Sequence, residues 1–373
     1  TYSYIYDGGF TPLLDEQRGG GKSNYLRKHN FGLGMQTKLS NGLKVRGTFN
    51  YVNSERRTPI TAQAFGGGGN GLFAALLFTP RSIDLMNLPY QSPVDGSNIY
   101  YRRGSTIQNP RWVLNNAGDY EYVQRFFGTL EASYDIAPWL SALYRVGIDQ
   151  YQLKSVREQN KGGQYNPDGF LETANRQNRI TDQVMNFLYN FKLSDDFSLD
   201  GVIGANLRRE VFSYTAVEST QQFVYGLFTH NNFVNHNSFA FESEENTMGV
   251  YATASLGYKN YLYFNVQARN DWTSTLEQAN RSILYPSASL SFVATDAIPS
   301  LQQSDLVNYL KVRLGYGTSA GYPSPYQTRT ILGTATNVFV TEGGSILNTN
   351  SLADRLGNNN LKPELHAELE LGV

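Results

Sequence analysis

The stretch Leu43-Lys44-Val45-Arg46-Gly47-Thr48-Phe49-Asn50-Tyr51 alternates apolar or small residues with polar ones at every position. Successive side chains of a β-strand point to opposite faces, so this segment predicts a strand with one apolar face and one polar face. The turn signal Asn41-Gly42 precedes it, and residues 31–39 alternate in the same way before that turn. Residues 31–51 therefore predict an antiparallel hairpin. Its apolar face could pack against a second sheet, as in a soluble sandwich, or meet lipid, as in a membrane barrel with a wet, charged lumen.

Further alternating segments follow in pairs, joined by short connections except in the last pair, where the connection is longer, and a final strand follows them. The paired segments are 122–134 with 140–151, 184–193 with 197–207, 249–258 with 261–269, and 285–293 with 309–316, and the last strand is 364–371. These segments and an opening strand predict about twelve strands of roughly ten residues, the length that crosses a bilayer at a tilt.

The connections at the other ends of these strands are long and polar. Unequal rims of this kind are typical of an outer-membrane barrel, with short periplasmic turns and long extracellular loops. We therefore predict an all-β fold, part of an antiparallel transmembrane β-barrel. The predicted long loops are 154–180, 209–246, 271–284 and 317–363.

Aromatic residues are abundant, with 26 Tyr and 21 Phe, while charged residues make up only 17% of the chain. Tyr and Trp gather where the predicted strands end, as the aromatic girdles of a membrane barrel require. The residues of this predicted girdle are Tyr51, Tyr134, Trp139, Tyr258, Tyr261, Tyr285 and Tyr309.

Composition excludes several classes of function. Lys and Arg number 31 and Asp and Glu 32, a net charge of −1, which gives no electrostatic footprint for nucleic acid. Cys is absent, so no disulfide scaffold or thiolate metal site can form. The four His are scattered, and we expect no metal and no cofactor. The longest apolar run, Leu72–Phe78, is far shorter than the ~20 residues of a spanning helix.

Catalytic motifs are also missing. No Gly-x-Ser-x-Gly elbow is present, and Gly66–Gly69 lacks the Lys-Ser/Thr pair of a phosphate loop. Asn166-Pro167-Asp168-Gly169 predicts a turn, because the spaced carboxylates of a calcium loop are absent. We expect a protein that is not an enzyme; an outer-membrane enzyme would need titratable groups clustered at the loop rim.

Two sets of residues are candidates for contact with a solute. The first lies on the polar faces of the strands, where we expect the side chains to line the lumen or to contact a plug. These lumen-lining residues are Lys44, Arg46, Arg125, Arg145 and Arg313. The second set lies in or beside long loops, where aromatic rings can stack on a substrate and Arg can bind its polar groups. These substrate-binding candidates are Tyr100, Tyr101, Arg102, Arg103, Asn270, Asp271 and Trp272.

Both loop candidates have a plainer alternative. The run at 100–103 could be an ordinary surface loop. The sequence Asn270-Asp271-Trp272 could form a network at the base of a loop, in which the carboxylate accepts backbone hydrogen bonds and the indole lies at the membrane interface.

Several segments resemble a known family. Residues 268–276 (ARNDWTSTL), 280–282 (NRS) and 285–291 (YPSASLS) are similar to the late-barrel motif of SusC/RagA-type TonB-linked outer-membrane transporters. The strand at 310–317 (LKVRLGYG) and the step at 360–364 (NLKPE) resemble the segments that follow it in that family. Upstream, 79–85 (TPRSIDL) and 109–112 (NPRW) are also similar, so the matches spread over about residues 25–373.

The resemblance implies a barrel of about 22 strands with a plugged lumen. It also implies that residues 1–373 are the middle-to-late part of one such barrel, and that the plug and the last strands are absent from them. It also implies a SusD-type surface lipoprotein lid, a TonB complex that supplies energy, and a large oligosaccharide or peptide as substrate. The location implied is the outer membrane of a Gram-negative, Bacteroidetes-like bacterium.

The sequence thus predicts an outer-membrane nutrient importer for glycans or peptides. The alternative is a secreted or surface β-rich module that binds glycans or acts as an adhesin. The two differ in what covers the apolar face: membrane lipid in the importer, and another layer of protein in the soluble module.

Overall fold

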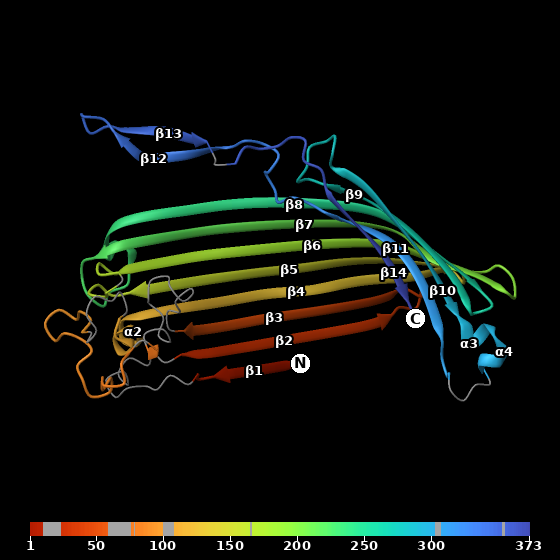
Figure 1. Ribbon diagram of the computed structural model, residues 1–373, viewed down its shortest axis with the longest axis horizontal. Helices are drawn as coiled ribbons and strands as arrows, with labels where there is room; N and C mark the ends of the chain where they lie inside the picture. The colour runs from red at the N-terminus through yellow and green to blue at the C-terminus, as the bar shows by residue number, and fades with distance from the viewer. Residues whose placement is uncertain are drawn as a thin grey trace.

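The computed structural model describes residues 1–9, 24–58, 76–77, 79–99, 108–164, 166–302, 307–352 and 355–373. Twelve antiparallel strands form one sheet in the order β1 to β11 and then β14 (Figure 1). Every strand pairs with its neighbour in sequence, except that β11 pairs with β14. The strands are β1 (Tyr2–Asp7), β2 (Tyr25–Lys38), β3 (Lys44–Thr58), β4 (Ala117–Ala137), β5 (Leu140–Gln159), β6 (Phe170–Lys192), β7 (Phe197–Gln222), β8 (Phe233–Tyr258), β9 (Leu262–Thr273), β10 (Ser282–Val293), β11 (Lys311–Gly321) and β14 (Glu364–Gly372).

The remaining elements are short. β12 (Leu332–Val340) and β13 (Ile346–Leu352) form a separate hairpin between β11 and β14. The helices in the described part of the chain are α2 (Pro110–Asn116), α3 (Ala294–Ala297), α4 (Pro299–Gln302) and the single turn η2 (His230–Asn232). Among the described residues, no helix is long and apolar enough to cross a membrane. The predicted all-β fold of about twelve strands is confirmed.

Two predicted loops are wrong. Residues 154–180 and 209–246 belong mostly to β5, β6, β7 and β8, which leaves only 160–169 and 223–232 as connections. These strands extend well beyond the 9–11 or so residues needed to cross a bilayer. Beyond the bilayer both faces of a strand meet water, so the apolar alternation fades although the hydrogen-bonded ladder continues.

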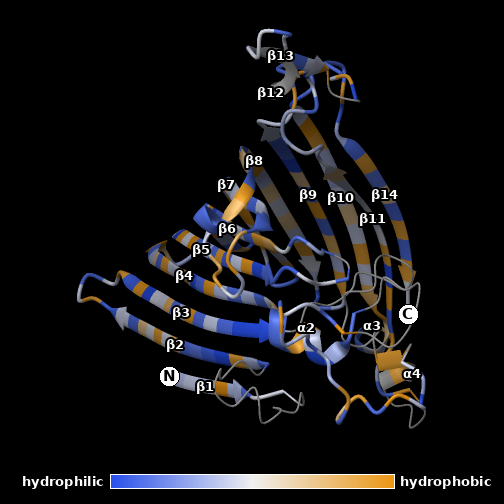
Figure 2. Cartoon of the chain, turned by 90° about the vertical axis from the view of Figure 1, so that its left-hand side faces the viewer, coloured by the Kyte–Doolittle hydropathy of each residue, from blue (hydrophilic) through white to orange (hydrophobic). Residues whose placement is uncertain are grey.

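The apolar face of the sheet is exposed. Register places Leu33 beside Phe49, and Leu130 beside the neighbouring Gly47. Phe49 is 46% exposed and Leu130 is 56% exposed, although a soluble protein would bury them. Alternating hydrophobic and hydrophilic bands run along the strands (Figure 2). The same face continues across the sheet through Ile148, Phe187, Ile203, Val250, Phe264, Leu290, Leu314 and Leu369, all of them exposed.

The short-turn rim carries rings in mutual contact. Trp139 stacks on Phe191 with centroids 4.9 Å apart, and Phe197 lies 4.8 Å from Tyr258. Tyr258 in turn makes an edge contact with Tyr261, at 5.5 Å. These rings form an aromatic band at one end of the apolar face, as expected for Trp139, Tyr258 and Tyr261 of the predicted girdle. The prediction is wrong for Tyr285, which lies on the polar face, where its hydroxyl bonds Asp271.

Tight turns on this rim fix the register of the hairpins. Gly42 has φ +89°, a conformation that favours glycine, and Asn41 Oδ1 accepts a hydrogen bond from the Leu43 N–H at 3.1 Å. Lys259 and Asn260 both have positive φ in the β8–β9 turn. Consecutive positive φ values match the right-handed twist of the strands that the turn joins.

Candidate functional site

The polar face of the sheet carries the predicted lumen residues. Odd-numbered residues of β4 share this face with even-numbered residues of β3, because Arg46 pairs with Glu131 in the register. Ion pairs join neighbouring strands along it. They are Lys44–Asp135 at 2.8 Å, Arg125–Asp149 at 2.5 Å, Arg145–Glu131 at 3.9 Å and Arg313–Glu370 at 2.5 Å.

Lys44, Arg46, Arg125, Arg145 and Arg313 therefore share one face of the sheet. Pairs this exposed contribute about 0–1 kcal/mol each to stability, so their main effect is on the charge that a solute meets. Whether they line an open channel or contact a plug stays a prediction.

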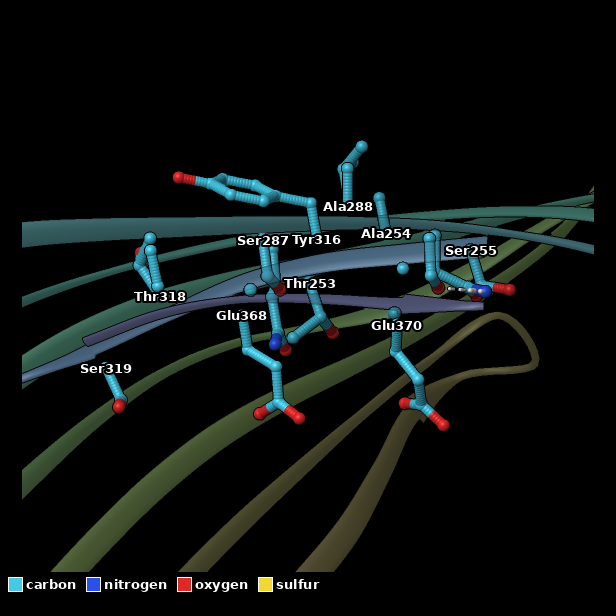
Figure 3. Close-up of a pocket in the computed structure, with 18 of the residues that line it drawn as sticks. Thr253, Ala254, Ser255, Ser287, Ala288, Tyr316, Thr318, Ser319, Glu368 and Glu370 are labelled. Carbon is cyan, nitrogen blue, oxygen red and sulfur yellow. Dashed lines mark hydrogen bonds between the residues drawn. The ribbon is translucent and has the colours of Figure 1, made fainter. Parts of the chain in front are cut away.

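A hollow of about 810 Å³ lies along β7–β11 and β14. Its inner lining is mostly small and polar, with Ser287, Ser289 and two glycines of β11 beside Glu368 and Glu370. Figure 3 shows Glu368 and Glu370 pointing to the side of the sheet opposite Tyr316 and Ala288. The same sheet thus presents carboxylates on one face and exposed apolar side chains on the other.

The sequence Asn270-Asp271-Trp272 does not form one site. Asp271 is 4% exposed and lies on the polar face, where its pairing partners are Gly249 and Ile283. Asn270 and Trp272 project from the opposite face, because consecutive strand residues alternate. Asn270 Nδ2 donates to Ser282 Oγ at 3.0 Å.

The carboxylate of Asp271 joins two strands to the segment after β11. Arg269 Nε lies 2.7 Å from Oδ1, Tyr322 donates to Oδ2 at 3.1 Å, and Tyr285 donates to the same oxygen. A Cβ on Gly249 would come too close to this carboxylate and to the Arg269 guanidinium, so a larger residue there would force the ion pair to move. These contacts join Asp271 to side chains and not to the backbone N–H groups that the loop-base alternative expects, and a role of Asp271 in binding substrate stays a prediction.

A folded loop cluster lies at the long-loop rim around α2. Asn109 caps the helix, accepting from the Arg111 N–H at 3.0 Å, and Pro110 occupies the first turn. Trp112 is fully buried, and its Nε1 donates to the Gly96 carbonyl at 2.8 Å. Arg111 donates to the carbonyls of Leu85, Met86 and Leu88. The helix therefore fastens residues 79–99 to the start of β4.

Buried amides connect this cluster to the turns of the longest strands. Asn160 Nδ2 donates to Asn116 Oδ1 at 3.1 Å, and Gln222 Nε2 donates to Asn160 Oδ1 at 3.2 Å. The Tyr225 hydroxyl donates to Asn116 Oδ1 and also lies 3.1 Å from the Gly96 carbonyl oxygen, and burial raises the pKa of Tyr225 to about 12. Sequence reasoning missed this network, because isolated Asn and Gln residues carry no spacing signal.

The candidates Tyr100, Tyr101, Arg102 and Arg103 lie outside the described residues. The segment before them is held by a hydrogen bond from the Ile99 N–H to the Tyr90 carbonyl at 2.9 Å. Gln108, after them, is fully buried. A role for these residues in binding stays a prediction.

A row of charged residues crosses the polar face just below the loop cluster. Register places Asp119, Arg157, Glu172 and Glu218 side by side on β4 to β7. Arg157 pairs with Glu172 at 3.3 Å, and burial raises the pKa of the Asp119 carboxyl. A second hollow, of about 380 Å³, lies between this row and the β5–β6 turn, where Asp168 lines it. Among the described residues, this part of the long-loop rim is therefore mainly acidic on its inner side.

Among the described residues, no group of three His, Cys, Asp or Glu side chains is placed to hold a metal ion.

Comparison with known proteins decides the family. A family model described as "TonB dependent receptor-like, beta-barrel" matches residues 48–373. The chain belongs to this family. TonB-dependent receptor barrels are outer-membrane proteins of Gram-negative bacteria. No curated protein sequence matches the chain.

Solved structures share the fold of this TonB-dependent receptor barrel. The RagAB peptide transporter is 16% identical with a TM-score of 0.73, over 94% of this chain and 38% of that one. The RagAB peptide importer in its "closed-closed" state gives the same values, and its "open-open" state gives a TM-score of 0.71 at 16% identity over the same shares. The chain thus spans 38% of the length of those transporter chains.

Proposed function

We propose that this chain is part of the wall of an outer-membrane importer that takes up glycans or peptides. The observation that carries the proposal is the opposite character of the two faces of one sheet. Exposed apolar side chains cover one face, and charged side chains with a large polar hollow occupy the other. A sheet with these faces separates lipid from a wet passage. Its mechanism would be binding and gated passage without covalent chemistry.

The proposed partners follow from the family. A plug and further strands of the same protein would complete one barrel with residues 1–373, and a TonB complex would supply energy through the plug. A SusD-type surface lipoprotein would close over the long-loop rim, and the host would be a Bacteroidetes-like bacterium. The folded loop cluster around Trp112 supports a docking role at that rim, because buried hydrogen bonds hold its shape before a partner arrives.

The adhesin alternative is disfavoured by the exposed apolar face. A soluble module would have to bury Phe49, Ile203 and Leu369, which are 46%, 56% and 73% exposed. Nothing in the described part of the chain forms a second layer over them.

The test is uptake by cells that carry the whole protein. Cells with the gene, without it, and with the gene but without TonB are given a labelled peptide mixture and a labelled oligosaccharide mixture. We expect one mixture to enter only when both the gene and TonB are present. Equal uptake in all three strains would contradict the proposal, as would release of the protein from membranes without detergent.

A further inference from the structure

The long-loop half of β8 is a free edge of the sheet. β8 pairs with β7 from Tyr258 up to Phe233, but its pairing with β9 stops at Thr247. Residues 233–246 therefore have a strand on one side only among the described residues, as Figure 1 shows where β9 leaves β8. Open edges of this length are ready templates for another strand.

Two bonds at the base of this edge show which backbone groups face the open side. The Asn246 carbonyl accepts from the Ser274 N–H at 2.8 Å, and the Glu244 N–H donates to the Tyr326 hydroxyl at 3.3 Å. Backbone direction alternates along a strand, so Glu242, Ala240 and Ser238 point their N–H and C=O groups the same way. These residues are all exposed.

The edge lies above the membrane. β9 has 12 residues, already the length of a spanning strand, and it ends where the free edge of β8 begins. Open backbone groups would cost several kcal/mol each in lipid, whereas water satisfies them here. A ligand strand would therefore replace water and would not displace lipid.

Exposed aromatic rings flank the edge on the inner side of the sheet. Phe239 is 46% exposed and Phe241 is 52% exposed, although both face the wet side. Phe241 makes a ring contact with Phe212 of β7, with centroids 6.2 Å apart. Glu242, on the other face of the same strand, is also exposed, and no ion pair of it occurs among the described residues.

We propose that this edge binds an extended peptide as an added β-strand. Main-chain bonds would form to Ser238, Ala240 and Glu242, apolar side chains two residues apart would pack beside Phe239 and Phe241, and a cationic residue next to them would face Glu242. The inference rests on the proposed importer function and deepens it by choosing peptide over glycan. A glycan lacks the alternating N–H and C=O groups that match a strand edge, and phenylalanine offers a sugar no hydrogen bond.

The acidic rim supports a cationic peptide. Glu218 of β7 lies directly opposite Asn237 of β8 and diagonally opposite Phe239. The backbones of such a diagonal pair are about 7–8 Å apart. Glu172 and Glu218 line the hollow on that side, and Arg157 is the cation among the described residues of its lining. This acidic row lies on the same face as the phenylalanine rings, so it would attract a positively charged peptide to the edge, while the cationic side chains of the bound strand would face Glu242 on the other face.

The first experiment changes the ligand. The whole protein, purified in detergent, is titrated with a fluorescent heptapeptide, Lys-Phe-Lys-Phe-Lys-Phe-Lys, and with versions N-methylated either on every Lys amide or on every Phe amide. One alternate set of N–H groups faces the edge and the other faces away. We expect one methylated version to lose at least tenfold in affinity and the other to bind like the parent. Equal binding by the two, or no binding by the parent, would overturn the proposal.

The second experiment changes the edge. Ala240→Pro removes an N–H that points away from β7, and proline is tolerated at such edge positions. We expect at least a tenfold loss of heptapeptide affinity, while Ala240→Ser binds like the parent protein. Phe239→Ser with Phe241→Ser serves as a second variant that leaves the backbone intact, and it should also weaken binding. Unchanged affinity in Ala240→Pro or in the double variant would refute the assignment.

A third measurement separates the possible occupants and the two proposals. A photoreactive amino acid at position 240 should capture the heptapeptide, and competition by a neutral malto-oligosaccharide should be absent. Capture of a lipoprotein or of another segment of the chain with the peptide excluded would overturn the peptide assignment. TonB-dependent uptake without heptapeptide binding would support the importer proposal and refute peptide binding at the β8 edge. Heptapeptide binding without any TonB-dependent uptake would support peptide binding at the edge and refute the importer proposal.

Discussion

Replacing Phe49 by Arg should block assembly into the membrane, whereas replacing Lys44 by Ala should not. Phe49 lies on the exposed apolar face, with its ring centroid 4.9 Å from that of Phe126. Lys44 lies on the opposite face and pairs with Asp135 at 2.8 Å. The two positions are five residues apart on one strand, so each is the control for the other.

The expected costs differ severalfold. Arg on the lipid face of a barrel costs about 2–4 kcal/mol at the bilayer midplane. Losing the aromatic pair adds about 0.5–1.5 kcal/mol, which brings the total for Phe49→Arg to about 2.5–5.5 kcal/mol. The Lys44 side chain is 43% exposed, so removing its ion pair should cost about 0–1 kcal/mol. A factor of ten in the folded fraction corresponds to about 1.4 kcal/mol.

The assay is the heat-modifiability gel, in which a folded barrel migrates differently before and after boiling. Urea titration of the folded band in lipid vesicles then gives the difference in stability. We expect the folded band of Phe49→Arg to be lost or to unfold at much lower urea, with Lys44→Ala close to the parent. If both variants fold equally well, or if Lys44→Ala is the worse of the two, the assignment of the faces is wrong.

Three further changes test the long-loop rim and the loop base. Gly249→Ala should destabilise β8 and β9 by about 1–3 kcal/mol through overpacking against Asp271, seen as a lower urea midpoint; an unchanged midpoint would contradict the packing described. Asn160→Ala should cost about 1–3 kcal/mol locally, because it removes the buried hydrogen bonds to Asn116 and from Gln222, and proteolysis of 79–99 should become faster. Burial raises the pKa of Asp119 in the folded state, so the stability that its proton contributes is fully present below the ordinary carboxyl pKa and is lost as pH rises through the raised value. Asp119→Asn should therefore flatten the dependence of stability on pH across that window, and a slope equal to that of the parent would refute this origin.

The membrane-spanning part of the fold could be predicted from sequence because one solvent lies on each face. Between Leu43 and Tyr51, the face toward lipid requires apolar residues and the face toward water allows polar ones. Apolar and polar residues therefore alternate with a period of two in the sequence. The predicted strand 364–371 is confirmed for the same reason, as its Leu residues are exposed and Glu368 and Glu370 line the hollow on the other face.

The long-loop rim could not be predicted in this way. Above the lipid, β7 and β8 have water on both faces, and residues 209–246 lose the alternation that would mark them as strands. Strand pairing in this region continues the register of the hydrogen-bonded ladder in the membrane-spanning part. That register depends on contacts between segments far apart in the sequence, which a local pattern does not show. The amide chain through Asn160 has the same character, since its partners are 44 and 62 residues away.

The sequence Asn270-Asp271-Trp272 illustrates a limit of motif reasoning. Three consecutive residues on a strand cannot all reach one solute, because the middle one points away from the other two. In the structure, Asp271 accordingly lies on the polar face, where it pairs with Arg269, and Trp272 projects from the apolar face. Strand parity alone could have found this split, had the strand been known to extend to Thr273.

The length of β8 links the fold to the proposed function. A strand of 26 residues is more than twice what a bilayer requires, so the excess must be stabilised outside the lipid. Its neighbour β7 also has 26 residues and supplies one side of that support, but β9 has only 12 and leaves the other side open. Extending β8 without extending β9 exposes backbone groups at the height where a solute would enter. If the solute is a peptide, this open edge can bind it as an added strand. If the solute is not a peptide, the edge only favours aggregation with other chains.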